Sequence, residues 1–209
     1  MKPFVLDLCH QNRNSFLGYK MSESLLISLF IIAILFLVFY GLWSIPNFSG
    51  LPWRPTSAER VRRALKMAKI QPGEVIYDLG SGDGRVLLQA VREFQVNAVG
   101  LEISPLLCLV SWLLVRANRL EKQVTIRRRD FYTTNLGQAD VVFAYMTSRQ
   151  VPRLLPHLEK QLKPGARVVT ISFDLDGWEP QLVDREQLVF LYQMPPQPGS
   201  LGTYLAKTL

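Results

Sequence analysis

The sequence predicts an α/β fold: a mostly parallel, Rossmann-like sheet of seven strands whose last strand is antiparallel, preceded by one transmembrane helix. Three observations carry this prediction. Short apolar runs alternate with helical patterns from about residue 57 onward, which is typical of a parallel sheet covered on both faces. A glycine-rich turn follows the first of these runs. An uncharged apolar stretch, long enough to cross a bilayer, precedes them all.

The chain of 209 residues divides into four predicted segments. We expect a polar N-terminal segment over 1–23, a transmembrane helix over 24–43, a proline- and glycine-rich linker over 44–56, and a globular domain over 57–209. About 19 apolar residues, at about 1.5 Å each, cover roughly 28 Å, which is close to the thickness of a bilayer core. We therefore expect contact with the membrane through residues 25–43; a buried helix of a soluble protein is the alternative.

Basic residues are unevenly distributed about this stretch. Those that follow it are Arg54, Arg60, Arg62, Arg63, Lys66 and Lys69, whereas only Lys2, Arg13 and Lys20 precede it. The positive-inside rule therefore predicts a single-pass membrane protein whose globular domain lies on the cytoplasmic side. The basic face of the helix expected at about 57–69 either rests on anionic headgroups or is solvated, and the sequence leaves both open.

Composition limits the classes of function. Much of the net charge of +7 follows the membrane stretch, so we interpret it as a local feature and expect no nucleic-acid partner. Cys9 and Cys108 have neither disulfide nor metal-ligand spacing, which indicates a reducing compartment and no metal site. His10 and His157 have no partner pattern, so we expect neither to act as a ligand or a base.

Helices and strands alternate along the rest of the chain. Thr56 and Glu59 form a predicted capping box for the helix over about 57–69. We expect strands at about 74–79, 97–103, 123–129, 140–145 and 166–173, with helices at about 84–94, from Pro105 onward and at 149–162. Two final strands, at about 187–193 and 203–208, leave no room for a crossover helix, so the last strand should be antiparallel.

The glycine-rich turn, Asp78-Leu79-Gly80-Ser81-Gly82-Asp83-Gly84, joins the first strand to the next helix. Glycine tolerates positive φ and lets a ligand approach the backbone, and such turns hold nucleotide-like ligands beside a helix N-terminus. The spacing differs from the dinucleotide fingerprint, and the Asp78 carboxylate would repel a pyrophosphate. S-adenosylmethionine (SAM), a cationic nucleoside without phosphate, suits this turn better. A purely structural turn is the alternative.

Acidic residues collect at the carboxyl ends of the first three strands, where open α/β sheets bind ligands. Glu102 lies about 20 residues beyond the glycines, where a carboxylate can accept both ribose hydroxyls. Asp130 can accept the adenine amino proton, and Phe131 can cover the ring. Alone, each acid could be an ordinary surface residue; together with Asp78 and the glycines, they predict a SAM site.

These segments also resemble a known family. Residues 75–85, 100–103 and 162–168 resemble the motifs of class I (seven-stranded) SAM-dependent methyltransferases. Residues 52–56, 77–85, 165–169 and 177–180 resemble more closely the protein-lysine methyltransferase family that acts on the adenine nucleotide translocase and the ATP synthase c subunit, with bacterial and archaeal relatives. The resemblance covers about residues 52–180, and implies a SAM-dependent protein-lysine N-methyltransferase whose protein substrate could itself lie in a membrane.

The resemblance also suggests roles for individual residues. In that family the element corresponding to Pro52-Trp53-Arg54-Pro55-Thr56 packs by the cofactor, although Arg54 within it has no assigned role. The full predicted cofactor-binding set is Thr56, Asp78, Gly80, Ser81, Gly82, Gly84, Glu102, Asp130 and Phe131, with SAM as the cofactor and no metal.

Tyr145, at the end of the fourth strand, is the candidate catalytic residue, because its hydroxyl or ring face could orient a lysine amine; it could equally be a packing residue. The segment Ala144-Tyr145-Met146-Thr147 lacks the Asn/Asp-Pro-Pro-aromatic motif of methyltransferases that act on amides and nucleobases. A neutral amine requires alignment rather than a strong base, which fits the absence of a catalytic histidine or cysteine. Two rival functions stay open: a methyltransferase for lipids or small molecules, and a non-catalytic SAM-binding membrane module.

The stretch 106–115 is apolar on nearly every face, more than a helix lying on a sheet requires. Either it is buried deeply in the core, or its outer face contacts the bilayer, the anchor helix or a second subunit. If Leu106, Leu109 and Leu113 pack inward, then Leu107, Trp112 and Val115 should lie nearer the outside.

Overall fold

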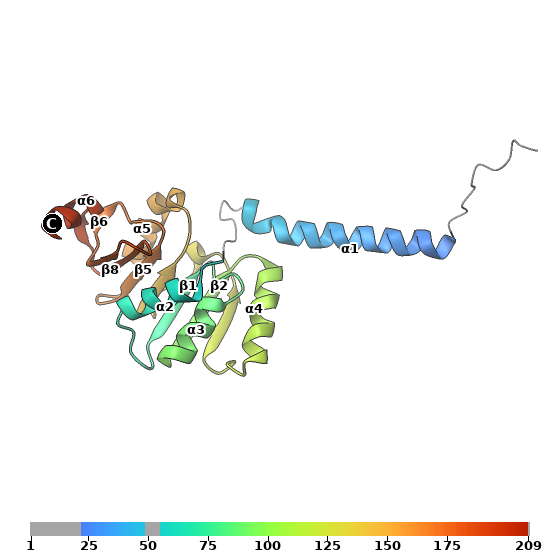
Figure 1. The fold of residues 1–209 in the computed structure, drawn as a ribbon, viewed down its shortest axis with the longest axis horizontal. Coiled ribbons are helices and arrows are strands. Elements are labelled where there is room, and N and C mark those ends of the chain that lie inside the picture. Colours follow the sequence, from blue (N-terminus) through green and yellow to red (C-terminus); the bar gives the residue numbers. More distant parts are fainter. Residues whose placement is uncertain (1–21, 49–54, 209) are drawn as a thin grey trace, which may run out of the picture. The chain divides into compact units, whose positions relative to one another are not determined.

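The structure, a computed structural model, describes the backbone of residues 22–48 and 55–208 and the side chains of 22–41 and 55–208. The chain forms two compact units, divided between Gly41 and Leu42. Helix α1 (Glu23–Phe48) is a single long helix (Figure 1), and its stretch Glu23–Gly41 is long and apolar enough to cross a membrane, judged by length and composition. The helix ends at Phe48 rather than at residue 43. It therefore includes Pro46 and the first residues of the predicted linker.

A seven-stranded sheet forms the centre of the second unit, in the order β3-β2-β1-β4-β5-β8-β7. Its strands are β1 (Val75–Leu79), β2 (Asn97–Glu102), β3 (Val124–Arg128), β4 (Val141–Ala144), β5 (Arg167–Ile171), β7 (Leu182–Asp184) and β8 (Val189–Gln193). Strands β1 to β5 are mutually parallel, whereas β8 pairs antiparallel with β5, and β7 antiparallel with β8. The predicted class of fold is thereby confirmed.

Helices cover both faces of this sheet. On one face lie α2 (Ala58–Met67), α3 (Arg85–Phe94) and α4 (Pro105–Ala117) (Figure 1). On the other lies α5 (Val151–Gln161), with the short 3-10 helices η1 (Phe131–Thr133) and η2 (Ser148–Gln150) before it in the chain. Alternate strand residues serve the two cores: Ile76 packs under α2 and α3, while Tyr77 packs on the side of α5.

The predicted strand over 203–208 is wrong, because α6 (Leu201–Thr208) occupies it. Ser200 and Thr203 cap this helix reciprocally: the Thr203 hydroxyl accepts the Ser200 N–H at 2.8 Å, and the Ser200 hydroxyl accepts the Thr203 N–H at 3.3 Å. The hairpin partner of β8 is instead β7, too short for its pattern to stand out. A separate two-stranded sheet pairs β6 (Gly177–Glu179) with β9 (Gln197–Gly199).

The capping box predicted for α2 is also wrong by one residue. The Ser57 hydroxyl caps the helix by accepting the Arg60 N–H at 3.3 Å, and Glu59 forms an ion pair with Arg63 at 3.6 Å. Serine and threonine are both good N-caps, so local preference could not choose between neighbours. The consequence is that the side chain of Thr56 is left free of the helix end.

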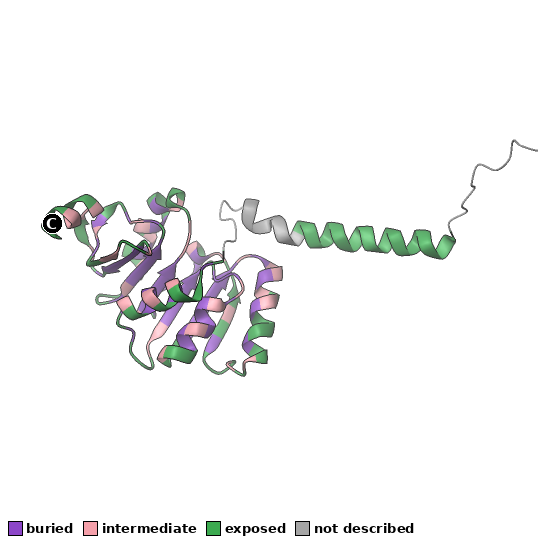
Figure 2. Cartoon of the chain, viewed as in Figure 1, coloured by how far each residue is buried: buried purple, intermediate pink, exposed green. Residues whose placement is uncertain are grey.

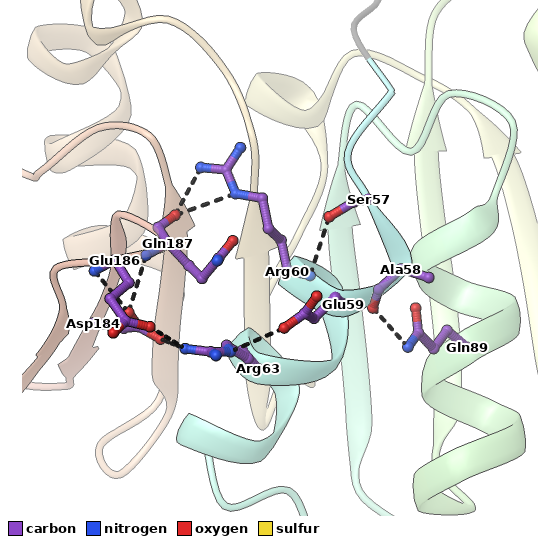
Figure 3. Close-up of polar contacts among 9 residues, drawn as sticks. All are labelled: Ser57, Ala58, Glu59, Arg60, Arg63, Gln89, Asp184, Glu186 and Gln187. Carbon is purple, nitrogen blue, oxygen red and sulfur yellow. Dashed lines mark hydrogen bonds and ion pairs between the residues drawn. The ribbon is translucent and has the colours of Figure 1, made fainter.

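Helix α2 is clamped to the turn between β7 and β8 through its basic residues (Figure 3). The Arg60 guanidinium donates to the carbonyl of Gln187 at 2.7 and 3.2 Å, and Arg63 contacts Asp184 at 3.3 Å and Glu186 at 3.1 Å. On the same helix, Arg62 forms an ion pair with Glu93 of α3 at 2.7 Å. Three arginines of α2 are therefore paired with groups of the domain itself, while the side chains of Arg62 and Arg63 stay partly exposed to solvent.

The rotation of α4 about its axis differs from the expectation. Leu107, Ser111 and Val115 face the sheet, whereas Leu109 and Leu113 are exposed, so the predicted inward set is wrong. The exposure of Trp112 is confirmed. An almost uniformly apolar helix has no periodicity from which its orientation can be read.

The orientation follows from a close contact with α3. A Cβ on Gly84 would lie 2.2 Å from the Ser111 hydroxyl oxygen, so the absence of a side chain at Gly84 makes room for Ser111. The small side chain of Ser111 thus lies against the start of α3, and the leucines at 109 and 113 are turned outward.

Candidate cofactor-binding site

A cavity of about 610 Å³ opens at the carboxyl ends of the parallel strands, within the range typical of small-molecule sites. Its walls come from the glycine-rich turn, the ends of β2 and β4, the segments that follow β3 and β4, and the residues before α2. The predicted residues that line it are Thr56, Asp78, Gly80, Ser81, Gly82, Glu102, Asp130, Phe131 and Tyr145.

Two other predictions have different outcomes. Gly84 does not line the cavity. It caps the start of α3 with φ +80° and lies against Ser111, so it serves the packing of α4 on α3. Trp53 lies outside the described residues, while Pro55 of the same element lines the cavity.

The glycine-rich turn is fixed to the end of β2. The N–H groups of Gly80 and Ser81 donate to the Leu101 carbonyl at 2.8 and 3.0 Å, and the Gly82 N–H donates to the Glu102 carboxylate at 2.9 Å. Gly80 and Gly82 have φ of +80° and +55°, the left-handed region that glycine reaches without strain. The turn thus presents its backbone to the cavity in a fixed shape.

Glu102 has more contacts than the sequence indicated. Besides Gly82, its carboxylate accepts the N–H groups of Ile103 at 2.9 Å and Ser104 at 2.8 Å, and the Ser104 hydroxyl caps α4. A carboxylate has about four lone-pair sites, so acceptor capacity remains for ribose hydroxyls. The buried Glu102 therefore joins the turn, the start of α4 and the cavity at one group.

Asp78 is buried at the end of β1, beneath the cavity. Desolvation, with smaller contributions from the negative charges of Glu102 and Asp83, raises the pKa of its carboxyl group to about 8. A bound cation would favour the ionised carboxylate. The acidic walls of the cavity therefore suit the positive sulfonium and ammonium groups of SAM.

We predict that SAM affinity depends on pH through Asp78. Below the pKa of about 8, Asp78 is protonated in the free protein, and binding a cation releases that proton. The association constant should therefore rise between pH 6 and 7.5 by up to about tenfold per pH unit, and Asp78→Asn should bind more weakly with a flatter profile. Titration calorimetry in buffers of different ionisation enthalpy measures both affinity and proton release.

The same raised pKa has a consequence for the stability of the free protein. The protonated Asp78 carboxyl group contributes stability to the folded state. This contribution is complete below the unfolded pKa of 3.8 and is lost as the pH rises through the folded pKa of about 8. For SAM binding, an affinity that stays constant between pH 6 and 7.5, without proton release, would contradict the predicted role of Asp78.

Thr56 is held at the cavity by an arginine. Arg85 donates to the Thr56 carbonyl at 3.1 Å and forms an ion pair with Asp83 at 2.6 Å. Burial acts to raise the pKa of Asp83, but the hydrogen bonds and charge of Arg85 outweigh it and hold that pKa below its usual value. The hydroxyls of Thr56 and Ser81 are buried without a hydrogen-bond partner among the described residues. Both residues line the cavity, and the unsatisfied Thr56 hydroxyl fits a polar ligand such as SAM, whereas the Ser81 hydroxyl lies against Gly100 of β2.

The segment after β3 supplies the wall expected to hold the adenine. One oxygen of the Asp130 carboxylate accepts the Tyr132 N–H at 3.0 Å and caps η1. The other oxygen takes no hydrogen bond from a described residue, and Phe131 is buried beside it. Both residues line the cavity, and their roles toward the adenine stay predictions.

Tyr145, just beyond β4, lines the opposite part of the cavity and also packs against the core. The Arg60 guanidinium lies 5.9 Å from its ring centroid and donates to the Ser172 hydroxyl at 2.8 Å. Ser172 lines the cavity with φ +68°, a conformation that serine adopts rarely and that often marks functional sites. Nothing in the sequence pattern had indicated Ser172.

Three other cavity residues were also missed from the sequence: Tyr132, Gln150 and Arg153. Arg153 lies 3.8 Å from the Tyr132 ring centroid, and the Tyr132 hydroxyl donates to the Gln150 side chain at 3.1 Å. These residues come from η1, η2 and α5, so only the fold brings them together. Among the described residues, no three His, Cys, Asp or Glu side chains are grouped so as to hold a metal ion.

The chain is similar to known methyltransferases. The model of the ANTKMT methyltransferase domain matches residues 78–182. A protein-lysine N-methyltransferase from Saccharolobus islandicus is 36% identical over 134 residues, which are 64% of this chain and 83% of the relative. The adenine nucleotide translocase lysine N-methyltransferase of Mus musculus is 30% identical over 156 residues, 70% of this chain and 68% of the relative.

Solved structures agree with the fold. An RNA methyltransferase from Salinibacter ruber, in complex with S-adenosyl-L-homocysteine, is 33% identical with a TM-score of 0.67, and the match covers 70% of this chain and 97% of that chain. S-adenosyl-L-homocysteine is what remains of SAM once its methyl group has been transferred. The similarity therefore extends to proteins that bind the cofactor to which the cavity is suited.

Proposed function

Because the chain belongs to the ANTKMT methyltransferase domain family and is a SAM-dependent methyltransferase, we propose that it methylates a lysine side chain of a protein. The observation that carries the proposal is the cavity, which joins an acidic cofactor end at Asp78 and Glu102 to an acceptor end at Tyr145. The 36% identity with a named protein-lysine N-methyltransferase supports lysine as the acceptor.

The residues of the chain would act by positioning and by charge. When bound, SAM supplies an electrophilic methyl group, and the acceptor must be a neutral amine aligned with it. The Asp78 carboxylate would hold the cationic end, the Glu102 carboxylate would accept the ribose hydroxyls, and Tyr145 would orient the amine by its hydroxyl or ring. The Arg60 guanidinium, 5.9 Å from the Tyr145 ring centroid, disfavours a second positive charge there and so favours the neutral amine.

The test is transfer of labelled methyl from SAM by the purified full chain, supplied with its own membrane fraction. We expect label in a protein band and, after hydrolysis, on lysine. Label recovered in RNA, as the description of the Salinibacter ruber protein suggests, or in an extractable lipid would overturn the proposal. As a matched variant, Tyr145→Phe keeps the ring and removes only the hydroxyl; slower transfer at unchanged SAM affinity would place the hydroxyl at the acceptor.

We further propose that α1 anchors the enzyme in a membrane as a single span, with the domain of residues 57–209 on the cytoplasmic side. Support comes from the apolar stretch Glu23–Gly41 and from the basic residues that follow it. The relative named for the adenine nucleotide translocase makes a membrane-protein substrate a natural candidate.

We predict that alkaline carbonate washing leaves the full-length chain in the membrane pellet. A helix with about 19 apolar residues is held by the bilayer, whereas a peripheral protein loses its electrostatic contacts at high pH. Immunoblots of pellet and supernatant give the answer. Recovery of the chain in the supernatant would rule out the anchor without affecting the transfer assay.

A further inference from the structure

The outer side of α4 carries an apolar surface without a partner in the domain. Leu109, Trp112 and Leu113 are 52%, 47% and 50% exposed, and Leu114 is exposed beside them. Figure 2 shows α4 at the margin of the domain, with exposed residues along its length. Within residues 55–208, the other large apolar side chains with comparable exposure are Leu182 and Leu188, which lie apart on β7 and the turn after it.

Basic residues surround these apolar side chains. The segment 116–129 contains six basic residues and one acid, Glu121. The side chains of Arg119, Arg127 and Arg129 form no ion pair or hydrogen bond with any residue in the described part of the chain. The Arg116 guanidinium lies 5.5 Å from the Trp112 ring centroid. This segment therefore differs from α2, whose arginines are engaged within the domain.

Both groups belong to one edge of the fold. Strand β3 is the outermost strand of the sheet on that side, and α4 packs against it. A surface hollow lined by Arg127, Arg128 and Arg129, with Thr133, Thr134 and Asn135, follows the end of β3. Exposed leucines and a tryptophan thus lie between arginines at the end of α4 and arginines at the end of β3.

We propose that this α4–β3 surface, formed by Leu109, Trp112 and Leu113 with the arginines of 116–129, docks on an anionic lipid bilayer. Tryptophan and arginine are the side chains suited to a bilayer interface, leucines enter its apolar margin, and arginines attract anionic headgroups. A nucleic acid would pair with the arginines but would leave the leucines exposed to water. The hollow beside Arg127, Arg128 and Arg129 offers space for the headgroup phosphates.

This inference rests on the membrane-anchoring part of the proposed function. Only residues 49–54 separate the end of α1 from Pro55, so an anchored chain would hold the domain beside the bilayer at high local concentration. Contacts with the bilayer that would be too weak to bind a free domain are then sufficient for docking of the anchored one. Arg129 lines both the hollow and the cofactor cavity, so docking would place one wall of the cavity next to the headgroups. The substrates favoured are lysines close to a membrane surface.

The test uses the full chain in nanodiscs that contain one chain each, with Cys9→Ser and Cys108→Ala removing the native thiols. Leu113→Cys carries an environment-sensitive fluorophore, and Leu188→Cys, with a native side chain 49% exposed against 50% for Leu113, is the matched control position. Brominated lipids quench fluorophores that enter the bilayer. We expect at least threefold stronger quenching at position 113 than at 188 in discs with anionic lipid, and less in neutral discs.

Charge variants test the electrostatic part. Arg119→Gln and Arg127→Gln should each weaken docking by roughly fivefold, as expected for one basic residue near an anionic surface. Arg62→Gln is the matched control, because the guanidinium of Arg62 is already paired with Glu93 at 2.7 Å. Quenching at 113 should therefore fall with the first two variants and stay constant with the third.

Several results would overturn the proposal. One is equal quenching at 113 and 188, and another is quenching that does not depend on lipid charge. Protection of position 113 that appears only with two chains per disc would assign the surface to a second copy, and protection by added RNA would assign it to nucleic acid. SAM binding and methyl transfer, measured on the same discs, distinguish these outcomes from failure of the proposed activity, and failure of the anchor is detected by carbonate washing.

Discussion

Replacing Glu102 with alanine is expected to lower SAM affinity by more than 100-fold. Losing hydrogen bonds from ribose to a charged acceptor costs about 1.5–3 kcal/mol. The structure adds a second effect, because the N–H groups of Gly82, Ile103 and Ser104 lose their common acceptor at the same time. The glycine-rich turn would then be less well ordered before the cofactor arrives, and binding would have to supply the ordering free energy.

Two measurements separate the contributions. Calorimetry gives SAM affinity, and thermal unfolding of the free protein gives the effect on the turn and on α4. Glu102→Gln keeps the shape and one acceptor oxygen but turns an NH2 group toward N–H donors. Its SAM affinity and its Tm should therefore lie between those of the wild type and those of Glu102→Ala. Unchanged SAM affinity in Glu102→Ala would reject the assignment of the site.

Gly84→Ala is expected to destabilise the domain more than Gly80→Ala does, because a Cβ on Gly80 would meet no atom within 4 Å. Alanine at φ +80° costs about 1–2 kcal/mol in backbone strain. The new Cβ would lie 2.2 Å from the Ser111 hydroxyl oxygen, and such overpacking costs about 1–3 kcal/mol more. The sum, about 2–5 kcal/mol, should lower Tm by roughly 5–15 °C in a domain of this size.

The chain offers a matched control for this substitution. Gly73 has φ +85°, but a Cβ there would meet no atom within 4 Å, so Gly73→Ala carries the strain without the collision. Its Tm should fall by only about 2–6 °C. Adding Ser111→Ala to Gly84→Ala should recover part of the loss, because the nearest atom is then absent. Equal effects of the two glycine substitutions would show that the contact with Ser111 does not set the packing of α4 on α3.

Local patterns predicted many of the residues that line the cofactor end of the cavity, and their roles in binding SAM stay predictions. Gly80, Gly82, Asp78, Glu102 and Asp130 line the cavity because parallel strands bring their carboxyl ends, and the turns that follow them, to one edge of the sheet. The acceptor end could not be predicted in the same way. Ser172 follows β5 and Arg153 lies in α5, and only the packed fold brings both to the cavity that Tyr145 lines.

The errors in the fold share a cause with the missed residues. Thr56 and Ser57 are nearly equivalent as helix caps, and contacts made by Arg85 across the domain decide which one is used. Helix α4 is apolar on most faces, so its orientation depends on Gly84 of a different helix. In each case the sequence allowed two local solutions, and a tertiary contact selected one.

The clamp between α2 and the β7–β8 turn also bears on how the chain folds during synthesis. Arg60 and its acceptor, Gln187, are 127 residues apart. At about 5–20 residues per second, a ribosome needs roughly 6–25 s to make the intervening chain. During that interval α2 would have neither the turn nor β8 to pack against. Helix α2 therefore lacks the partners of Arg60 and Arg63 in that turn until the β7–β8 hairpin has been made, and this hairpin completes the packing of α2.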